Sequence, residues 1–122
     1  MKFEIRGQIR GGKNNMIVLR NGMHIPKPEW ARWRDEVVSS MLKQKAPHQP
    51  RFPIEERVSL RIDYIPGDLR RRDVPAILDS IFHCLERAGI VKDDSQIKDL
   101  VFSTGEKSKY PSTVIEITEH FL

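Results

Sequence analysis

The sequence predicts an α+β fold in which two helices pack on one mixed four-stranded sheet, in the order β-α-β-α-β-β. Residues 2–10 and 56–65 alternate apolar and polar side chains, which is the pattern of half-buried strands. Two other segments, one from about residue 28 and one over 74–88, carry apolar residues at helical spacing. A chain of 122 residues of which 39% are hydrophobic fits a single domain spanning residues 1–122.

The first predicted strand has Phe3, Ile5 and Ile9 on its apolar side. A loop at residues 11–15 follows, since glycine and asparagine break regular structure. The pair Asn21-Gly22 favours a tight turn, so residues 16–26 are expected to form a short hairpin.

The first predicted helix begins near Pro28, because proline is tolerated in the first turn of a helix. Its apolar residues follow one another at intervals of three and four, which favours core packing over a role for its tryptophans in binding bases. This stripe consists of Trp30, Trp33, Val37 and Met41, widened by Val38 and Leu42.

The second half of the chain predicts a strand at 56–65, a helix at 74–88 that Gly89 ends, and strands near 97–104 and 112–119. Residues 105–111 are expected to join the last two strands as a hairpin loop. The predicted core face of the second helix consists of Ile77, Leu78, Ile81, Phe82 and Leu85.

Charge divides the chain near residue 72. Residues 1–72 hold 16 Lys and Arg against 8 Asp and Glu, a balance of +8, whereas residues 73–122 hold 5 against 9, a balance of −4. A basic surface favours a polyanion as partner, although an uneven spread of charge over solvated faces explains the same numbers.

Several classes of protein are excluded by composition. Cys84 is the only cysteine, so neither a disulfide framework nor a Cys-rich zinc site can form, and Cys84 itself is expected to pack in the core. No apolar run approaches the ~20 residues of a membrane span, and no secretory signal is visible at the N-terminus. We therefore expect a cytoplasmic protein without a membrane partner.

Four acidic residues around the second helix could carry chemistry: Asp73, Asp79, Asp93 and Asp94. Carboxylates suit Mg²⁺, and a bound divalent ion can activate water and stabilise a phosphodiester during hydrolysis. Each residue also has a simpler explanation. Asp73 can cap the helix, Asp79 can lie on its solvated face, and Asp93 with Asp94 can form a turn.

Three segments carry a family resemblance: Arg70-Arg71-Arg72-Asp73, the helix end Leu85-Glu86-Arg87-Ala88-Gly89-Ile90, and Asp93-Asp94-Ser95-Gln96-Ile97. Together with the early loop Gly12-Lys13-Asn14-Asn15 they resemble the RusA family of Holliday junction resolvases. That family comprises small homodimeric, Mg²⁺-dependent endonucleases of bacterial and often phage origin, which cut four-way DNA junctions. The resemblance implies a Mg²⁺ cofactor, with Mn²⁺ as an alternative, branched DNA as substrate, and a role in DNA recombination and repair.

The resemblance also assigns residues. Asp73 matches the family's first aspartate, and Asp94 matches the usual catalytic member of the later pair, beside Asp93. Basic and amide side chains would hold the DNA phosphates: Lys13, Asn14, Asn15, Arg70, Arg71 and Arg72.

The chain departs from the family pattern at the start of the second helix. Pro75 stands in place of the second aspartate, Ala76 in place of an asparagine, and Asp79 in place of a lysine. Because Asp79 follows position 75 by one helical turn on the same face, we expect it to replace the missing carboxylate, with Glu86 as the other candidate. The predicted catalytic residues are Asp73, Asp79 and Asp94, and Asp93 joins them as a metal ligand. The alternatives are a catalytically degenerate DNA-binding or regulatory module, and a nuclease for flaps or single strands.

Overall fold

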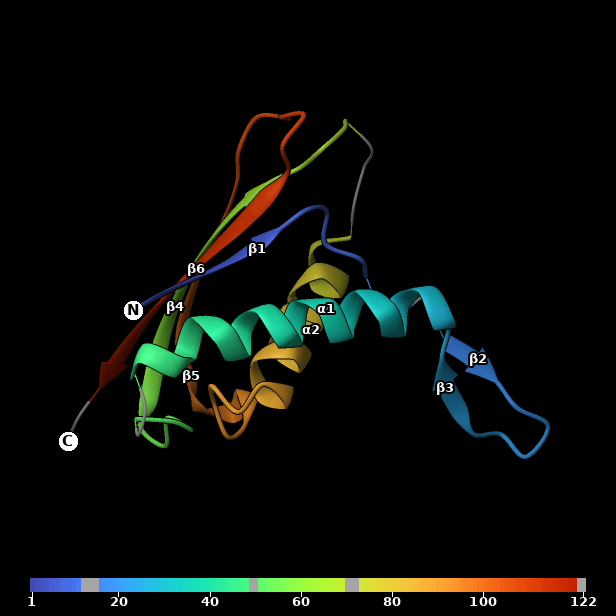
Figure 1. Cartoon of the computed structure of the whole chain (residues 1–122), viewed down its shortest axis with the longest axis horizontal. Coiled ribbons are helices and arrows are strands. Elements are labelled where there is room, and N and C mark those ends of the chain that lie inside the picture. Colours follow the sequence, from blue (N-terminus) through green and yellow to red (C-terminus); the bar gives the residue numbers. More distant parts are fainter. Residues whose placement is uncertain (12–15, 49–50, 70–72, 121–122) are drawn as a thin grey trace.

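Four strands form the main sheet, in the order β1-β6-β4-β5, and two helices cover it (Figure 1). The computed structural model describes residues 1–11, 16–48, 51–69 and 73–120. The strands are β1 (Lys2–Arg6), β4 (Arg57–Ile65), β5 (Ile97–Thr104) and β6 (Ser112–His120), and the helices are α1 (Pro28–Lys45) and α2 (Val74–Arg87). The predicted α+β fold is confirmed.

Strand β4 is the centre of the sheet. It pairs antiparallel with β6, placing Leu60 opposite Ile117, and parallel with β5, placing Leu60 opposite Leu100. Its alternate residues are buried beneath the helices: Val58, Leu60, Ile62 and Tyr64. The alternation in the sequence therefore marks one covered face of the sheet and one face open to solvent.

The first strand is shorter than predicted. It ends at Arg6 because Gly7 adopts a φ of 89° and turns the chain, while its N–H donates to the carbonyl of Pro111 at 2.8 Å. Glycine reaches this left-handed region without the steric cost that other residues incur. Ile9, the last residue of the predicted strand's apolar side, is nevertheless buried beyond the turn.

The predicted hairpin between the last two strands is wrong. Strand β4 lies between β5 and β6, and residues 105–111 pass across its end, where Gly105 N–H donates to Tyr64 O at 2.7 Å. The reason is topological. The crossover through α2 makes β5 parallel to β4 and places it on one side of β4, while β6 occupies the other side.

The helices bury most of the stripes that their spacing predicts, but Leu42 of α1 is 45% exposed, and Leu78 and Phe82 of α2 are half-buried. In α1, Trp30, Val37 and Met41 are buried and Trp33 is half-buried. In α2, Ile77, Ile81 and Leu85 are buried with Cys84, and burial raises the pKa of the Cys84 thiol to about 12. A thiol with so high a pKa is a poor nucleophile, which agrees with a packing role.

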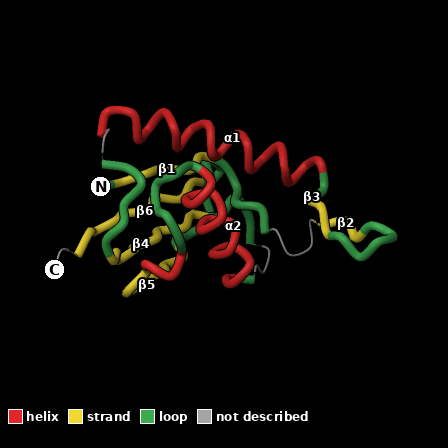
Figure 2. Tube along the Cα trace, turned by 90° about the horizontal axis from the view of Figure 1, so that it is seen from below, coloured by secondary structure: helices red, strands yellow, loops and turns green. Residues whose placement is uncertain are grey.

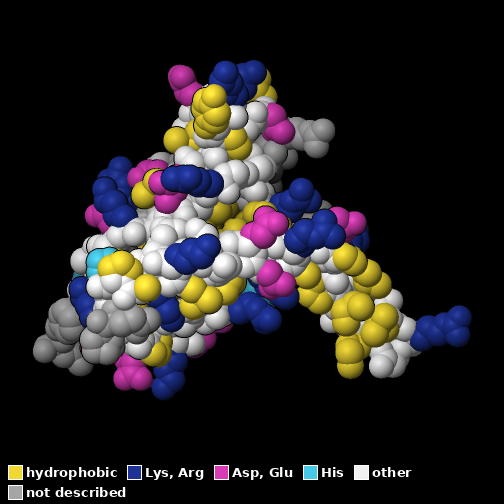
Figure 3. Space-filling model, in the orientation of Figure 1, with side chains coloured by type: hydrophobic (Ala, Val, Ile, Leu, Met, Phe, Trp, Pro, Cys, Tyr) yellow, Lys and Arg dark blue, Asp and Glu magenta, His cyan; other side chains and the backbone are white. Residues whose placement is uncertain are grey.

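The early hairpin projects from the start of α1 as an arm made of β2 (Met16–Val18) and β3 (His24–Pro26) (Figure 1). Its turn is the predicted one, with the Asn21 side chain accepting a hydrogen bond from Met23 N–H at 3.0 Å. Hydrophobic side chains gather over this arm (Figure 3). Those that are most exposed are Ile17, Val18, Leu19, Met23 and Ile25.

Candidate metal centre

Helix α2 separates the predicted acidic residues into two groups. Asp73 immediately precedes its first residue, whereas Asp93 and Asp94 follow its last turn and lead into β5. The helix has 14 residues and is therefore about 21 Å long at about 1.5 Å per residue. Asp73 and Asp94 accordingly lie at opposite ends of α2 within one chain.

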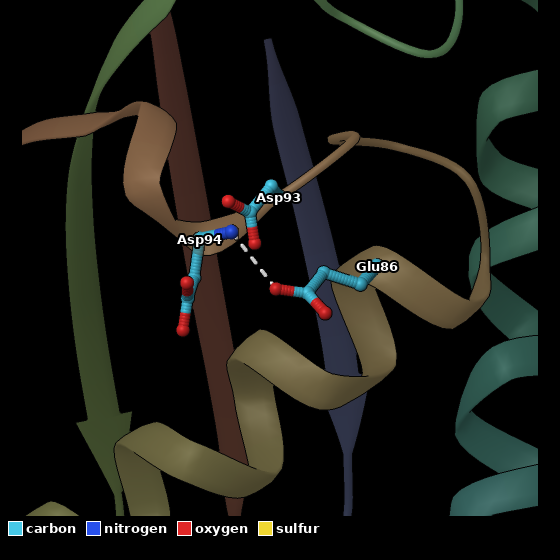
Figure 4. A group of neighbouring side chains, drawn as sticks. All are labelled: Glu86, Asp93 and Asp94. Carbon is cyan, nitrogen blue, oxygen red and sulfur yellow. Dashed lines mark hydrogen bonds between the residues drawn. The ribbon is translucent and has the colours of Figure 1, made fainter.

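Three carboxylates meet at the C-terminal end of α2 (Figure 4). Glu86 in the last turn of the helix lies with Asp93 and Asp94 so that one oxygen from each is within 4.8 Å of the others. The Glu86 Oε1 atom accepts a hydrogen bond from the Asp94 N–H at 2.8 Å. The three oxygens are close enough to share one divalent cation, and carboxylate oxygens are the ligands that Mg²⁺ prefers.

The loop that carries Asp93 and Asp94 is held by Gln96. Its Oε1 atom accepts hydrogen bonds from the N–H groups of Lys92 and Asp93, at 2.9 and 2.8 Å. Its Nε2 group donates to the carbonyls of Ile54 and Glu56, at 2.7 and 2.9 Å. One side chain thus ties this loop to the segment before β4, which limits the positions that the two carboxylates can take.

Asp93 also caps the short helix η2 (Asp94–Gln96). The Ser95 hydroxyl donates to the Asp93 carboxylate, and this hydrogen bond is the main cause that lowers the Asp93 pKa below its usual range. The carboxylate therefore stays ionised at neutral pH, as a metal ligand must. Asp93 and Asp94 thus do form the turn that was the simpler explanation for them, and the same two residues also contribute carboxylates to the acidic group.

Two of the predicted catalytic residues lie outside this group. Asp73 occupies the N-cap position of α2, exposed, and its side chain makes no capping hydrogen bond within the described part of the chain. Asp79 is exposed in the middle of α2, seven residues before Glu86, which is about 10 Å along the helix axis. Neither belongs to the set of carboxylates within 4.8 Å.

Glu86 is the member of the group that was expected only as an alternative to Asp79. A signal for it is present in the sequence, since Gly89 ends the helix and turns the chain back so that Asp94 returns to the last turn. Helical spacing predicts which residues of α2 share a face, but it does not predict that the chain after Gly89 turns back towards Glu86. Gly89 thus signals a turn after Glu86, but the contact between Glu86 and Asp94 is established only in the folded chain.

The predicted DNA-binding residues lie outside the described residues: Lys13, Asn14, Asn15, Arg70, Arg71 and Arg72. Two of the described positions that flank them, Gly11 and Asp73, lie at the start of α2. Gly11 approaches so closely that an added Cβ would lie 3.1 Å from the Ala76 Cβ in the first turn of α2, and Asp73 immediately precedes that turn. Gly11, before the first basic segment, and Asp73, after the second, thus lie near the N-terminal end of α2, away from the acidic group.

The chain matches no protein-family model, and a search of the curated proteins finds no match. No helix in the described part of the chain is long and apolar enough to cross a membrane.

Proposed function

We propose that the protein is a Mg²⁺-dependent endonuclease that cuts branched DNA such as four-way junctions, and that the group of Glu86, Asp93 and Asp94 holds the metal ion. The single observation that supports this most is the convergence of three carboxylates at the segment that resembles the RusA family. The ion would supply an activated water and stabilise charge on the scissile phosphate. Of the chain's own residues, Gln96 and Ser95 position the carboxylates.

The distribution of charge favours DNA as the polyanion. Basic residues are concentrated in residues 1–72, which carry a balance of +8 within the chain's net charge of +4. Contacts from basic side chains to phosphates would supply affinity and orientation with little reading of base sequence. Two strands of a junction must be nicked, which a homodimer with two equivalent sites can do.

The test is nicking of a labelled four-way junction by the purified protein, with and without Mg²⁺ or Mn²⁺. We expect cleavage that requires the ion and falls at least about 100-fold in Asp94→Asn, since one ligand is then neutral. Asp99→Asn is the matched control, because Asp99 is an exposed aspartate five residues along the chain that belongs to β5 and not to the acidic group. Cleavage that survives Asp94→Asn would contradict the proposed metal site.

A second candidate function is a DNA-binding or regulatory module without catalysis. The observation that favours it is the separation of Asp73 from the acidic group within one chain, together with Pro75 and Ala76 in place of the family's residues. Binding of the junction without nicking at any divalent metal tested would support this function and remove the endonuclease. A flap or single strand cut faster than the junction would instead identify a different DNA substrate.

A further inference from the structure

The arm formed by β2 and β3 leaves the protein at the start of α1 and extends away from the four-stranded sheet (Figure 1, Figure 2). In the described part of the chain its two strands pair only with each other. A two-stranded ribbon of this kind has no core of its own in which to bury apolar side chains. Apolar side chains on the arm are therefore expected to meet a surface outside this chain.

One face of the arm is a block of four apolar side chains. Ile17 lies directly opposite Ile25. The next pair toward the turn is Leu19 and Met23, since the Leu19 N–H donates to the Met23 carbonyl at 2.8 Å. Side chains two residues apart in a strand share a face, so the four lie together, and all of them are exposed. We call this set the apolar face of the arm.

Charge indicates what kind of surface the apolar face meets. Residues 5–28 contain no Asp or Glu and five basic residues, which are Arg6, Arg10, Lys13, Arg20 and Lys27. Arg20 is exposed in the turn of the arm, whose far end carries basic atoms in Figure 3, and Lys27 lies at its root before α1. An apolar surface with a cation at each end and no carboxylate is complementary to a polyanion that also offers apolar groups. DNA has both, with phosphates outside and the faces of its bases within.

The root of the arm is held in place. The carbonyl of Arg10 accepts hydrogen bonds from the Trp30 indole at 3.1 Å and from the Ser80 hydroxyl at 2.7 Å, which ties the chain before the arm to both helices. After the arm, Pro26 and Pro28 fix the backbone φ and so limit bending where β3 leads into α1. A hairpin with a fixed root can keep its direction when it pushes against stacked bases.

We propose that the arm is a wedge that enters the branch point of the DNA, with its apolar face against unstacked bases and Arg20 against a flanking phosphate. That the DNA is branched rests on the proposed function. Side chains such as Leu, Ile and Met enter between base pairs in other DNA-binding proteins, where unstacking the bases costs free energy. The cost is smallest where the stack is already interrupted, as it is at a branch. The arm thus makes binding depend on the branch and not on base sequence.

The first test follows the fluorescence of 2-aminopurine, an adenine analogue that stacking quenches, placed beside the branch of a four-way junction without metal. Wild type is expected to raise this fluorescence at least about threefold at saturation, because bases leave the stack. The double variant Leu19→Ser with Met23→Ser is expected to bind the junction through its basic residues and to lose most of the rise. Val18→Ser is the matched control and should keep the full rise, since Val18 is 61% exposed on the opposite face of the arm.

Cleavage with Mg²⁺ gives a second measurement. The Leu19→Ser, Met23→Ser variant is expected to nick a fully paired junction about tenfold more slowly than wild type, but a junction with mismatched bases at the branch less than about twofold more slowly, because those bases are already unstacked. The variant Leu19→Met with Met23→Leu keeps the apolar face and should nick both junctions at the wild-type rate. An equal defect of the serine variant on both junctions would overturn the wedge.

Arg20 has its own test. Arg20→Ala is expected to lower the slope of log affinity against log salt concentration by about one, which is the effect of one lost phosphate contact. An unchanged slope would overturn the placement of the arm on DNA.

Other occupants of the apolar face give different results. A lower solution mass of the Leu19→Ser, Met23→Ser variant than of wild type in light scattering would assign the face to a second copy of the chain. Binding of phosphatidylglycerol vesicles that this variant loses would assign it to a membrane, and either result overturns the wedge. A junction that is nicked while its 2-aminopurine stays quenched also overturns the wedge but leaves the endonuclease standing. A junction whose bases unstack but that is never nicked contradicts the endonuclease and supports the wedge.

Discussion

The two ends of α2 differ in how firmly their carboxylates are held. At the C-terminal end, Gly89 stops the helix, Lys45 donates to the Ala88 carbonyl at 2.7 Å, and Gln96 secures the returning loop. At the N-terminal end, Asp73 lies in extended backbone without a capping bond in the described part of the chain. The C-terminal end holds its carboxylates in fixed positions, whereas Asp73 at the N-terminal end has no comparable hydrogen bond in the described part of the chain.

Metal binding should show the largest difference between the two ends. Asp94→Asn is expected to weaken Mn²⁺ binding at least about tenfold, because it removes a charged oxygen ligand from the acidic group. Asp73→Asn should change the affinity less than about twofold in the same titration, because Asp73 lies outside the acidic group. Isothermal titration calorimetry measures both, and equal losses in the two variants would erase the distinction between the ends.

Stability should distinguish the ends next. Gln96→Ala leaves four backbone groups without their partner, and we expect the free energy of unfolding in urea to fall by about 1–3 kcal/mol. The matched variant Gln44→Ala removes a similar clamp on Glu4 at the β1 edge and reports what such a side chain contributes away from the acidic group. A Gln96→Ala protein as stable as wild type would show that the loop is held by other contacts.

Asp73→Ala should have a smaller effect on stability. Because its side chain makes no capping hydrogen bond within the described residues, the change in unfolding free energy is expected to stay below about 0.5 kcal/mol. Replacing an N-cap aspartate that does make the capping hydrogen bond by alanine typically lowers the free energy of unfolding by about 1 kcal/mol. A loss of that size in urea unfolding would place Asp73 among structural capping residues.

The smallest effect concerns His83, between the two ends. Burial, helped by the positive charges of Arg34 and Arg87 and opposed by Glu86, lowers the pKa of His83 below its ordinary value of 6.5. The unfolded chain then takes up the proton first, so the contribution to stability is present above about pH 6.5 and declines as the pH falls below it. His83→Gln should flatten this part of the pH dependence of unfolding, and an NMR titration of His83 above pH 6.5 would contradict the shift.

Most of the fold follows from local pattern. The strand over Arg57–Ile65 and the helix over Val74–Arg87 were predicted within about a residue, because alternation and helical spacing report which side of an element is buried. The strand order was not predicted. The loop over 105–111 has the composition of a hairpin loop, but the two strands that it joins, β5 and β6, are separated by β4 in the sheet. Which strand β6 pairs with depends on which strand edges are still free after the crossover through α2 has placed β5 beside β4, and the local sequence pattern carries no information about this.

The candidate site divides in the same way. The sequence by itself determined which residue types surround α2, with Asp73 before it and Asp93 and Asp94 after it, as well as the apolar spacing that makes it a helix. Only the tertiary structure decided that Glu86 joins Asp93 and Asp94 while Asp73 and Asp79 lie apart. The physical reason is that a helix converts sequence separation into about 1.5 Å of length per residue, whereas the turn at Gly89 brings residues eight apart into hydrogen-bond contact.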